Sequence, residues 1–336
     1  MTELKGGGRA GRRGADEGRP ADRPIVVAAT EGADDRVRPF ALERAPVRGR
    51  IVRLGPVLDE ILALHDYPPP LARQLARLAA LTALLGSMVK TDGRVTVQAR
   101  GGEDAPLAYM VADCTLGRED EPAGLRAYAS VRADHDLVAG GREADLAAWV
   151  GERGDLAITL EFTRTGRRYQ GIVPVEAGDL AAAAEHYFDR SEQIPTRVKL
   201  AAERHAPSRG WRAGGLLIQH MPADGGRAAA ADPDAWPRAR MLFETASDAE
   251  LLDPALGDDA LLYRLFHEEG VRVFAPVALV HRCGCSAEKL RGVLAQFSQA
   301  ERAEMCEADG LITAVCQYCG RRYRFHPDEI TGAARA

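Results

Sequence analysis

Two pairs of cysteines near the C-terminal end of the chain are the residues best suited to do chemistry. One residue separates Cys283 from Cys285, and two residues separate Cys316 from Cys319. Two short-spaced thiol pairs of this kind are typical of a tetrahedral metal site, because each pair can present two thiolates to one ion. Soft thiolate ligands favour zinc over calcium or magnesium. We therefore expect one Zn²⁺ per chain, held by these four cysteines.

Other residues near the pairs are weaker candidates for metal chemistry. The cysteine spacing does not follow the usual runs of iron–sulfur proteins. His281 and His326 flank the pairs and could replace a cysteine as a ligand, but four thiols already complete a site. Cys306 lies between the pairs on a predicted helix, where we expect it to be partly buried. Cys114 belongs to a strand-like run far from the pairs, and we interpret it as a core thiol.

The module that carries the four cysteines, residues 281–336, has few apolar side chains. A core of this size rarely folds alone, so much of its stability must come from the metal. Loss of the metal should therefore unfold the module. Thiolates are also the form of cysteine that oxidants attack. A zinc–thiolate centre in such a module is suited to act as an oxidant-sensitive switch.

Residues 246–280, in front of this module, are predicted to form a helical linker. The apolar side chains of Leu261, Leu262, Leu265 and Phe266 recur at helical spacing, and Asp and Glu residues are unusually dense around them. Such an apolar stripe must pack against another part of the protein. We therefore expect the linker to be packed and not a free coil.

Residues 39–245 have the pattern of a globular core domain. Strand-like runs are predicted at 48–54, 94–100, 107–114, 125–131, 156–162, 169–175, 197–201 and 211–219, and helices at 56–65, 71–85, 178–189 and 235–245. Strands and helices do not alternate regularly. The order predicts an α+β fold with a largely antiparallel sheet, followed by the helical linker and the small zinc module.

Composition excludes several classes of protein. The 336 residues are 46% apolar and carry a net charge of −5, which argues against a protein devoted to nucleic-acid backbone. No apolar run is long enough for a membrane span. Residues 1–38 are rich in Gly, Arg, Ala and Asp and lack the apolar region of a secretion signal, so we predict a disordered tail. The few clustered cysteines do not form a secreted disulfide framework, and we expect a cytoplasmic protein.

Several short stretches of the chain resemble one known family. They are HDYP at 65–68, RVTVQ at 94–98, RYQG at 168–171, RSEQIPTR at 190–197, GGLLIQ at 214–219 and YRLFHEE at 263–269. Together with the two cysteine pairs, and in this order, they resemble the heat shock protein 33 family of redox-regulated bacterial chaperones. The resemblance covers residues 46–330.

The resemblance implies a mechanism. In the reduced protein the four thiolates would hold zinc, and the chaperone would be inactive. Oxidants would form the disulfides Cys283–Cys285 and Cys316–Cys319, with loss of zinc, unfolding of the module and loosening of the linker. The apolar linker residues would then bind unfolding client proteins without ATP, in a homodimer. Apolar surface exposed in this way binds other proteins.

Two other functions are compatible with parts of the sequence. A zinc-ribbon nucleic-acid binder would use arginines and aromatic residues of the last predicted strand region, namely Arg321, Arg322, Arg324, Tyr318, Tyr323 and Phe325. A thiol oxidoreductase would use Cys316 and Cys319, but such a motif normally opens a helix, and here a glycine and a strand-like run follow. We find no nucleophile elbow or phosphate-binding glycine loop, so we predict a binding protein and not an enzyme.

Overall fold

The computed structural model describes residues 34–89, 92–117, 121–132, 145–175, 178–205, 210–221 and 232–330. The strands are β1 (Arg36–Leu42), β2 (Val47–Leu54), β3 (Gly93–Arg100), β4 (Leu107–Thr115), β5 (Ala123–Val131), β6 (Asp155–Phe162), β7 (Arg167–Pro174), β8 (Thr196–Arg204), β9 (Trp211–His220), β10 (Val271–Val273), β11 (Val277–His281), β12 (Ile312–Val315) and β13 (Arg322–Phe325). The helices are α1 (Pro56–Leu62), α2 (Pro69–Gly86), α3 (Leu146–Val150), α4 (Leu180–Tyr187), α5 (Ala235–Glu244), α6 (Asp248–Leu252), α7 (Asp258–Phe266), α8 (Ala287–Leu294) and α9 (Gln299–Glu304).

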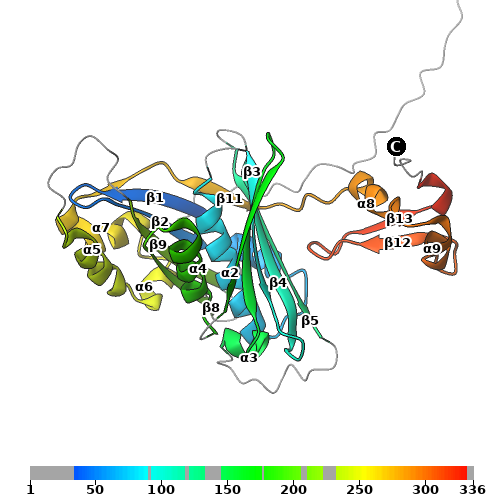
Figure 1. Cartoon of the computed structure of the whole chain (residues 1–336), viewed down its shortest axis with the longest axis horizontal. Helices are drawn as coiled ribbons and strands as arrows, with labels where there is room; N and C mark the ends of the chain where they lie inside the picture. Colours follow the sequence, from blue (N-terminus) through cyan, green and yellow to red (C-terminus); the bar gives the residue numbers. More distant parts are fainter. Residues whose placement is uncertain are drawn as a thin grey trace, which may run out of the picture.

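One large sheet forms the core of the protein (Figure 1). Its strand order is β7-β6-β3-β4-β5-β11-β1-β2-β9-β8, and β10 adds to β1 beside β11. Among the described strands every pairing is antiparallel except that of β11 with β5. The predicted α+β fold with a largely antiparallel sheet is therefore confirmed.

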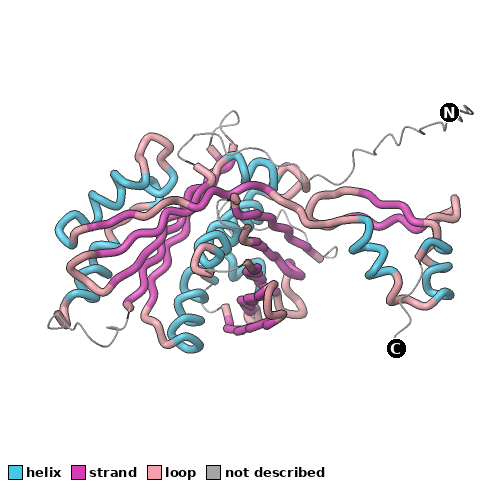
Figure 2. Tube along the Cα trace, turned by 90° about the horizontal axis from the view of Figure 1, so that it is seen from above, coloured by secondary structure: helices cyan, strands magenta, loops and turns pink. Residues whose placement is uncertain are grey.

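The long helix α2 lies inside the curve of this sheet (Figure 2). Fourteen of its eighteen residues are buried, because strands from both halves of the sheet pack around it. The first turn begins with prolines, whose fixed φ suits the start of a helix. The strands show the alternating burial expected of period-two side chains, as in β3. The main hydrophobic core lies between the helix and the sheet.

A second hydrophobic core covers the opposite face of β1, β2, β8 and β9. It is closed by α5, α6 and α7, which lie on the outside of this part of the sheet (Figure 1). Since side chains alternate along a strand, β1 sends Val37 to the first core and Phe40 to the second. The linker predicted at 246–280 is thus built into the fold as one wall of a core.

The structure differs from the predictions at two boundaries and in one additional helix. The strand β1 begins at Arg36, inside the predicted tail, and residues 1–33 of that tail lie outside the described part of the chain. The linker is helical only as far as 269, and its last part forms β10 and β11. Helix α3 was not predicted. These are short elements that are stabilised by neighbours distant in sequence, which local periodicity does not reveal. No described helix is long and apolar enough to cross a membrane.

The C-terminal module follows directly after β11 and projects from the core (Figure 1). It contains α8, α9 and the β12–β13 hairpin. Serine N-caps fix the starts of both helices, through Ser286 and Ser298. The buried hydrophobic side chains of its own cluster are Leu294, Ile312, Phe325 and Ile330. This small core agrees with the thin apolar set found in the sequence.

Candidate metal centre

The four predicted ligand cysteines come together in one cluster. Their Sγ atoms all lie within 4.8 Å of one another. The Sγ atoms of Cys283 and Cys316 are 3.7 Å apart, and those of Cys285 and Cys319 are 3.4 Å apart. Four thiolates at about 2.3 Å from a tetrahedral zinc ion would be separated by about 3.8 Å. The donor set and its spacing therefore fit a zinc ion, and all four thiols are free.

Two backbone turns present the sulfurs to one another. Cys283 follows two residues after the end of β11, and Cys316 and Cys319 lie in the tight turn that joins β12 to β13. In this turn the amide of Cys316 donates to the carbonyl of Arg321 at 2.9 Å, and Gly320 donates back to Cys316 at 2.8 Å. Gly320 has φ +65°, a conformation that favours glycine. This glycine therefore allows the tight turn that carries two of the four thiols.

The environment shifts the pKa values of Cys283, Cys316 and Cys319 in different directions. Burial raises the pKa of Cys316 and of Cys319, and the nearby sulfur of Cys283 adds to both shifts. Burial acts in the same direction on Cys283, but hydrogen bonds from Cys285, Cys319 and Arg126 outweigh it and lower the pKa of Cys283. Four thiolates at these distances repel one another, so the cluster needs a cation to ionise fully. A divalent metal would therefore bind with release of protons.

Groups outside the cluster contact the sulfurs and the backbone between them. The hydroxyl of Tyr323 lies 3.2 Å from Cys285 Sγ, and the Nζ of Lys289 donates to the carbonyl of Gly284 at 2.6 Å. Arg126 Nη1 lies 3.8 Å from Cys283 Sγ. Donors of this kind orient metal ligands and balance their charge.

Arg126 belongs to β5 of the core domain and joins the two domains. Its Nε and Nη2 pair with buried Asp113 of β4 at 2.8 and 2.5 Å, and its guanidinium lies 3.9 Å from the ring centre of Tyr318. The same contact region includes the Tyr128–Tyr318 ring pair, with centroids 6.2 Å apart, and a 3.0 Å hydrogen bond from Tyr109 to Gln317. The metal module therefore docks on the β4–β5 face through the turn that carries two of its ligands.

This docking was not predicted from the sequence. Arg126 and Cys283 are separated by 157 residues, and no periodicity links them. The available signal was Asp113, a carboxylate in an otherwise apolar strand, since buried charges are paired.

The other candidate ligands lie away from the cluster. His281 Nδ1 faces Glu60 at 3.5 Å, and His326 is exposed and faces Asp328 at 3.4 Å. Cys306 is half-buried against the small module core, as predicted. Cys114 is buried, and burial raises its pKa to about 12, as expected of a core thiol.

Of the residues proposed for nucleic-acid binding, the three arginines are exposed, but two of the three aromatic side chains are covered. Phe325 is buried in the module core, and Tyr318 is covered by Arg126. Arg324 pairs with Asp309. The Cys316–Cys319 turn leads into strand β13 and not into a helix, so it lacks the helix N-terminus that activates oxidoreductase thiols.

The apolar linker residues are buried in the second core. Leu261, Leu262 and Phe266 are fully buried, and Leu265 is 2% exposed. The ring of Phe266 stacks on Phe40 of β1, with centroids 5.7 Å apart. The expectation that the linker is packed is confirmed, and the structure shows that its partner is the preceding domain.

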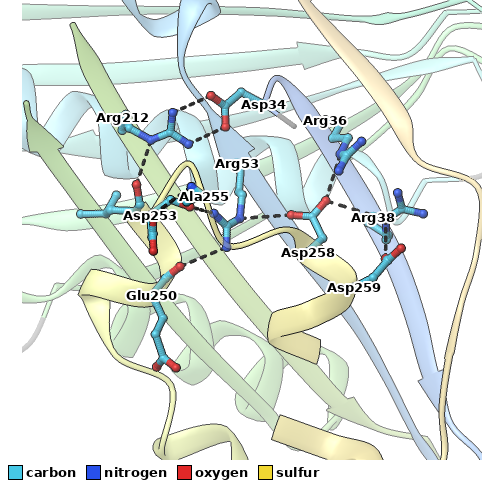
Figure 3. A network of polar contacts seen from close by, with 11 residues as sticks. Asp34, Arg36, Arg38, Arg53, Arg212, Glu250, Asp253, Ala255, Asp258 and Asp259 are labelled. Carbon is cyan, nitrogen blue, oxygen red and sulfur yellow. Dashed lines mark hydrogen bonds and ion pairs between the residues drawn. The ribbon is translucent and has the colours of Figure 1, made fainter. Parts of the chain in front are cut away.

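A network of ion pairs also holds the linker (Figure 3). Arg53 of β2, 1% exposed, pairs with Asp258 of α7, 2% exposed, at 3.1 Å. Arg53 further donates to the carbonyls of Asp253 and Glu250. Arg36 of β1 donates to the second carboxylate oxygen of Asp258 at 2.9 Å. This network was not predicted from the sequence, since Arg53 is one of three arginines in β2 and nothing local distinguishes it from the other two.

The fold and the site define a class of protein. A four-thiol metal module is attached to an α+β core through a linker that is buried in that core. The chain belongs to the Hsp33 family, whose model, described as Hsp33 protein, matches residues 35–326.

Related proteins and a solved structure agree with this assignment. The 33 kDa chaperonin of Caulobacter vibrioides is 43% identical over 299 residues, covering 88% of this chain and 95% of that protein. The 33 kDa chaperonin of Methylobacillus flagellatus is 38% identical and covers 88% and 92%. The crystal structure of the Thermotoga maritima 33 kDa chaperonin shares the fold, with a TM-score of 0.70 at 22% identity over 88% of this chain and 96% of that one. Family membership supports a chaperone role.

Docking of the module can be tested from both of its sides. Tyr318→Leu removes the ring beneath Arg126, and Arg126→Ala removes the cation. We expect Tyr318→Leu to speed amide exchange in the 316–320 turn and in β5 by about fivefold, because a cation–π contact stabilises by about 0.5–1 kcal/mol or more. Arg126→Ala should speed it by more, because it also leaves the buried carboxylate of Asp113 without its cationic partner. Hydrogen exchange on the zinc-loaded chain measures this. Arg100→Ala, which breaks a strand arginine–aspartate pair elsewhere in the sheet, should leave the turn unchanged.

Proposed function

We propose that the chain is a redox-regulated, ATP-independent holdase that is inactive while reduced and zinc-bound. Cys283, Cys285, Cys316 and Cys319 would hold one Zn²⁺. Oxidation would convert them to disulfides within each pair, and the freed linker and the core face beneath it would bind unfolding proteins. The observation that carries the proposal is that the linker's apolar residues are buried at one end of the segment that reaches the thiol cluster at its other end.

Strand β11 supports a physical connection between the two events. It lies between β5 and β1 and joins the two halves of the sheet, with Leu279 and Val280 both buried. It ends two residues before Cys283 and follows β10, which pairs with β1 directly after the linker helices. Unfolding that starts at the cysteines would therefore first reach β11 and then the linker.

The thiol chemistry balances with a two-electron oxidant. Each pair of thiolates would give two electrons to one molecule of hypochlorous acid, which leaves as chloride and hydroxide while one S–S bond forms. When bound, zinc would supply most of the folding free energy of the module, since few of its side chains are buried. After oxidation the module would have no ligand left to keep the metal.

Partners, oligomeric state and cellular location complete the proposed function. Unfolded or partly folded proteins are the proposed partners, with no membrane or nucleic-acid partner. The oxidised form would be a homodimer, and the protein would act in the cytoplasm.

One experiment tests the whole sequence of events. Zinc content, free thiols and suppression of aggregation of a heat-unfolding test protein are measured on the full chain before and after hypochlorite. We expect one zinc per chain at first, followed by loss of that zinc and of four thiols together with a gain of holdase activity. The Cys306→Ser variant should behave like the parent chain.

Two results would contradict the proposal. Zinc that stays bound while activity appears would separate the metal from regulation. Zinc that leaves without any gain of activity would make the site purely structural.

A further inference from the structure

The sheet face beneath the linker holds two arginines directly opposite each other. Arg36 of β1 and Arg53 of β2 are Cα partners in the strand register, and both side chains point to the linker side. Like charges in opposed positions destabilise a strand pair. Here the carboxylate of Asp258 lies between them, 2.9 Å from Arg36 Nε and 3.1 Å from Arg53 Nε (Figure 3).

Two more arginines extend this cationic edge. Arg38 of β1 lies 3.7 Å from Asp258 and 3.2 Å from Asp259. Arg212 of β9 donates to the carbonyl of Leu252 at 2.9 Å. Arg212 also pairs with Asp34, which is not part of the linker, so its charge stays balanced when the linker leaves. Arg36, Arg38 and Arg53 would lose their linker carboxylates.

The rest of the same face is apolar. Along β1, β2 and β9 it presents the buried side chains of Phe40, Ile51, Leu216 and Ile218. The linker matches both parts of this face. Its apolar residues cover the apolar part, and residues 248–269 include seven acidic residues against one arginine. Without the linker, the face would combine these four apolar side chains, which we call the apolar plate, with the cationic edge formed by the arginines.

We propose that this face is an interaction surface selective for acidic, amphipathic segments of unfolding proteins, and that the linker occupies it as an internal mimic of such a segment. The inference rests on the proposed function for the release of the linker. Charge complementarity is the basis for the choice of partner: an apolar segment alone would leave opposed arginines without a counter-charge, and a polyanion alone would leave the apolar plate in water.

A peptide pair tests the selectivity. The first is a fluorescent peptide of residues 246–270, and the second has the same sequence with Glu250→Gln, Asp253→Asn, Asp258→Asn and Asp259→Asn. Binding to the full chain is followed by fluorescence anisotropy, with the chain oxidised and, separately, reduced but opened by Asp258→Ala. We expect the acidic peptide to bind both opened forms about tenfold or more tightly than the neutralised peptide, and not to bind the reduced parent chain.

A variant of the face supplies the control. Arg36→Gln removes one opposed cation that is partly exposed, so the sheet should still fold. It should reduce the preference for the acidic peptide while leaving the affinity for the neutralised peptide unchanged.

Other outcomes would overturn the inference. Equal binding of the two peptides would show that the face does not select charge. Displacement of the acidic peptide by short RNA at similar concentrations would make it a plain polyanion site, and peptide binding that falls as the protein concentration rises would assign the face to a second copy of the chain. An oxidised chain that suppresses aggregation but binds both peptides equally would leave the proposed function intact.

Discussion

The Asp258→Ala chain is expected to be an active holdase while it is still reduced and zinc-bound. Asp258 is 2% exposed and is the carboxylate that pairs with Arg53, itself 1% exposed. Burial lowers the pKa of Arg53, and the charge of Asp258 opposes that effect. Removing one partner of a buried ion pair costs about 3–5 kcal/mol, because the other charge stays buried without compensation. Only an undocked linker lets Arg53 reach water.

The expected size of the effect follows from this cost. A loss of about 3–5 kcal/mol shifts the ratio of docked to undocked linker by about 10²–10³-fold or more. Suppression of aggregation by the reduced chain measures the released state, and hydrogen exchange over residues 246–270 measures the linker directly. The zinc content should stay at that of the parent chain, since the substitution lies outside the thiol cluster.

A neighbouring residue provides the control for this substitution. Asp259 is in the same first turn of α7, but its side chain is 65% exposed, and among the described residues it pairs with Arg38, at 3.2 Å. Asp259→Ala removes an equal charge from the same helix turn, and an exposed pair contributes at most about 1 kcal/mol. It should leave the reduced chain inactive. Equal activation by both substitutions, or by neither, would contradict a specific role of the buried pair.

The parts of the site that the sequence predicts are those encoded over short distances. Cys283 with Cys285, and Cys316 with Cys319, signal a metal site by local spacing alone. The apolar stripe of the linker likewise follows helical period, so its burial could be expected before its partner surface was known. The same holds for strand β3, where buried and partly exposed side chains alternate over eight residues.

The features that the sequence did not predict depend on contacts between segments that are distant in the chain. Arg53 and Asp258 are more than 200 residues apart, and the local sequence around one does not indicate the other as its partner. Strand β11 has only five residues, and it is a strand because β5 and β1 provide partners on both sides. Arg53 is one of three arginines in β2, and only the fold shows that it is the one buried against a carboxylate.

Removal of zinc from the reduced chain is expected to unfold the C-terminal module and to leave the core domain folded. The module's own cluster has four buried hydrophobic side chains, each worth about 1.5–3 kcal/mol. A structural zinc ion contributes about 10–16 kcal/mol in comparable small modules. The metal therefore exceeds any single packing contribution. Chelation, or the Cys316→Ser substitution, should abolish amide protection in residues 287–330, while α2 and β3–β5 keep theirs.

The Cys306→Ser variant separates loss of the metal from loss of a thiol. Cys306 is half-buried against the module core and lies outside the four-thiol cluster, and its thiol donates to the carbonyl of Arg302 at 3.4 Å. The variant should keep its zinc and its protection pattern. A zinc-free parent chain with a fully protected module would contradict the metal-dependent fold.

The same chelation experiment decides whether unfolding of the module spreads to the linker through β11. The strand is held on both sides by backbone pairing, so an unfolded module alone does not have to release it. If β11 transmits the change, protection should disappear from 277–281 and from the linker helices together with the module. If the module unfolds while both remain protected, release of the linker requires more than loss of the metal. The buried pair of Arg53 and Asp258 would then be the second barrier, and Asp258→Ala combined with chelation should remove it.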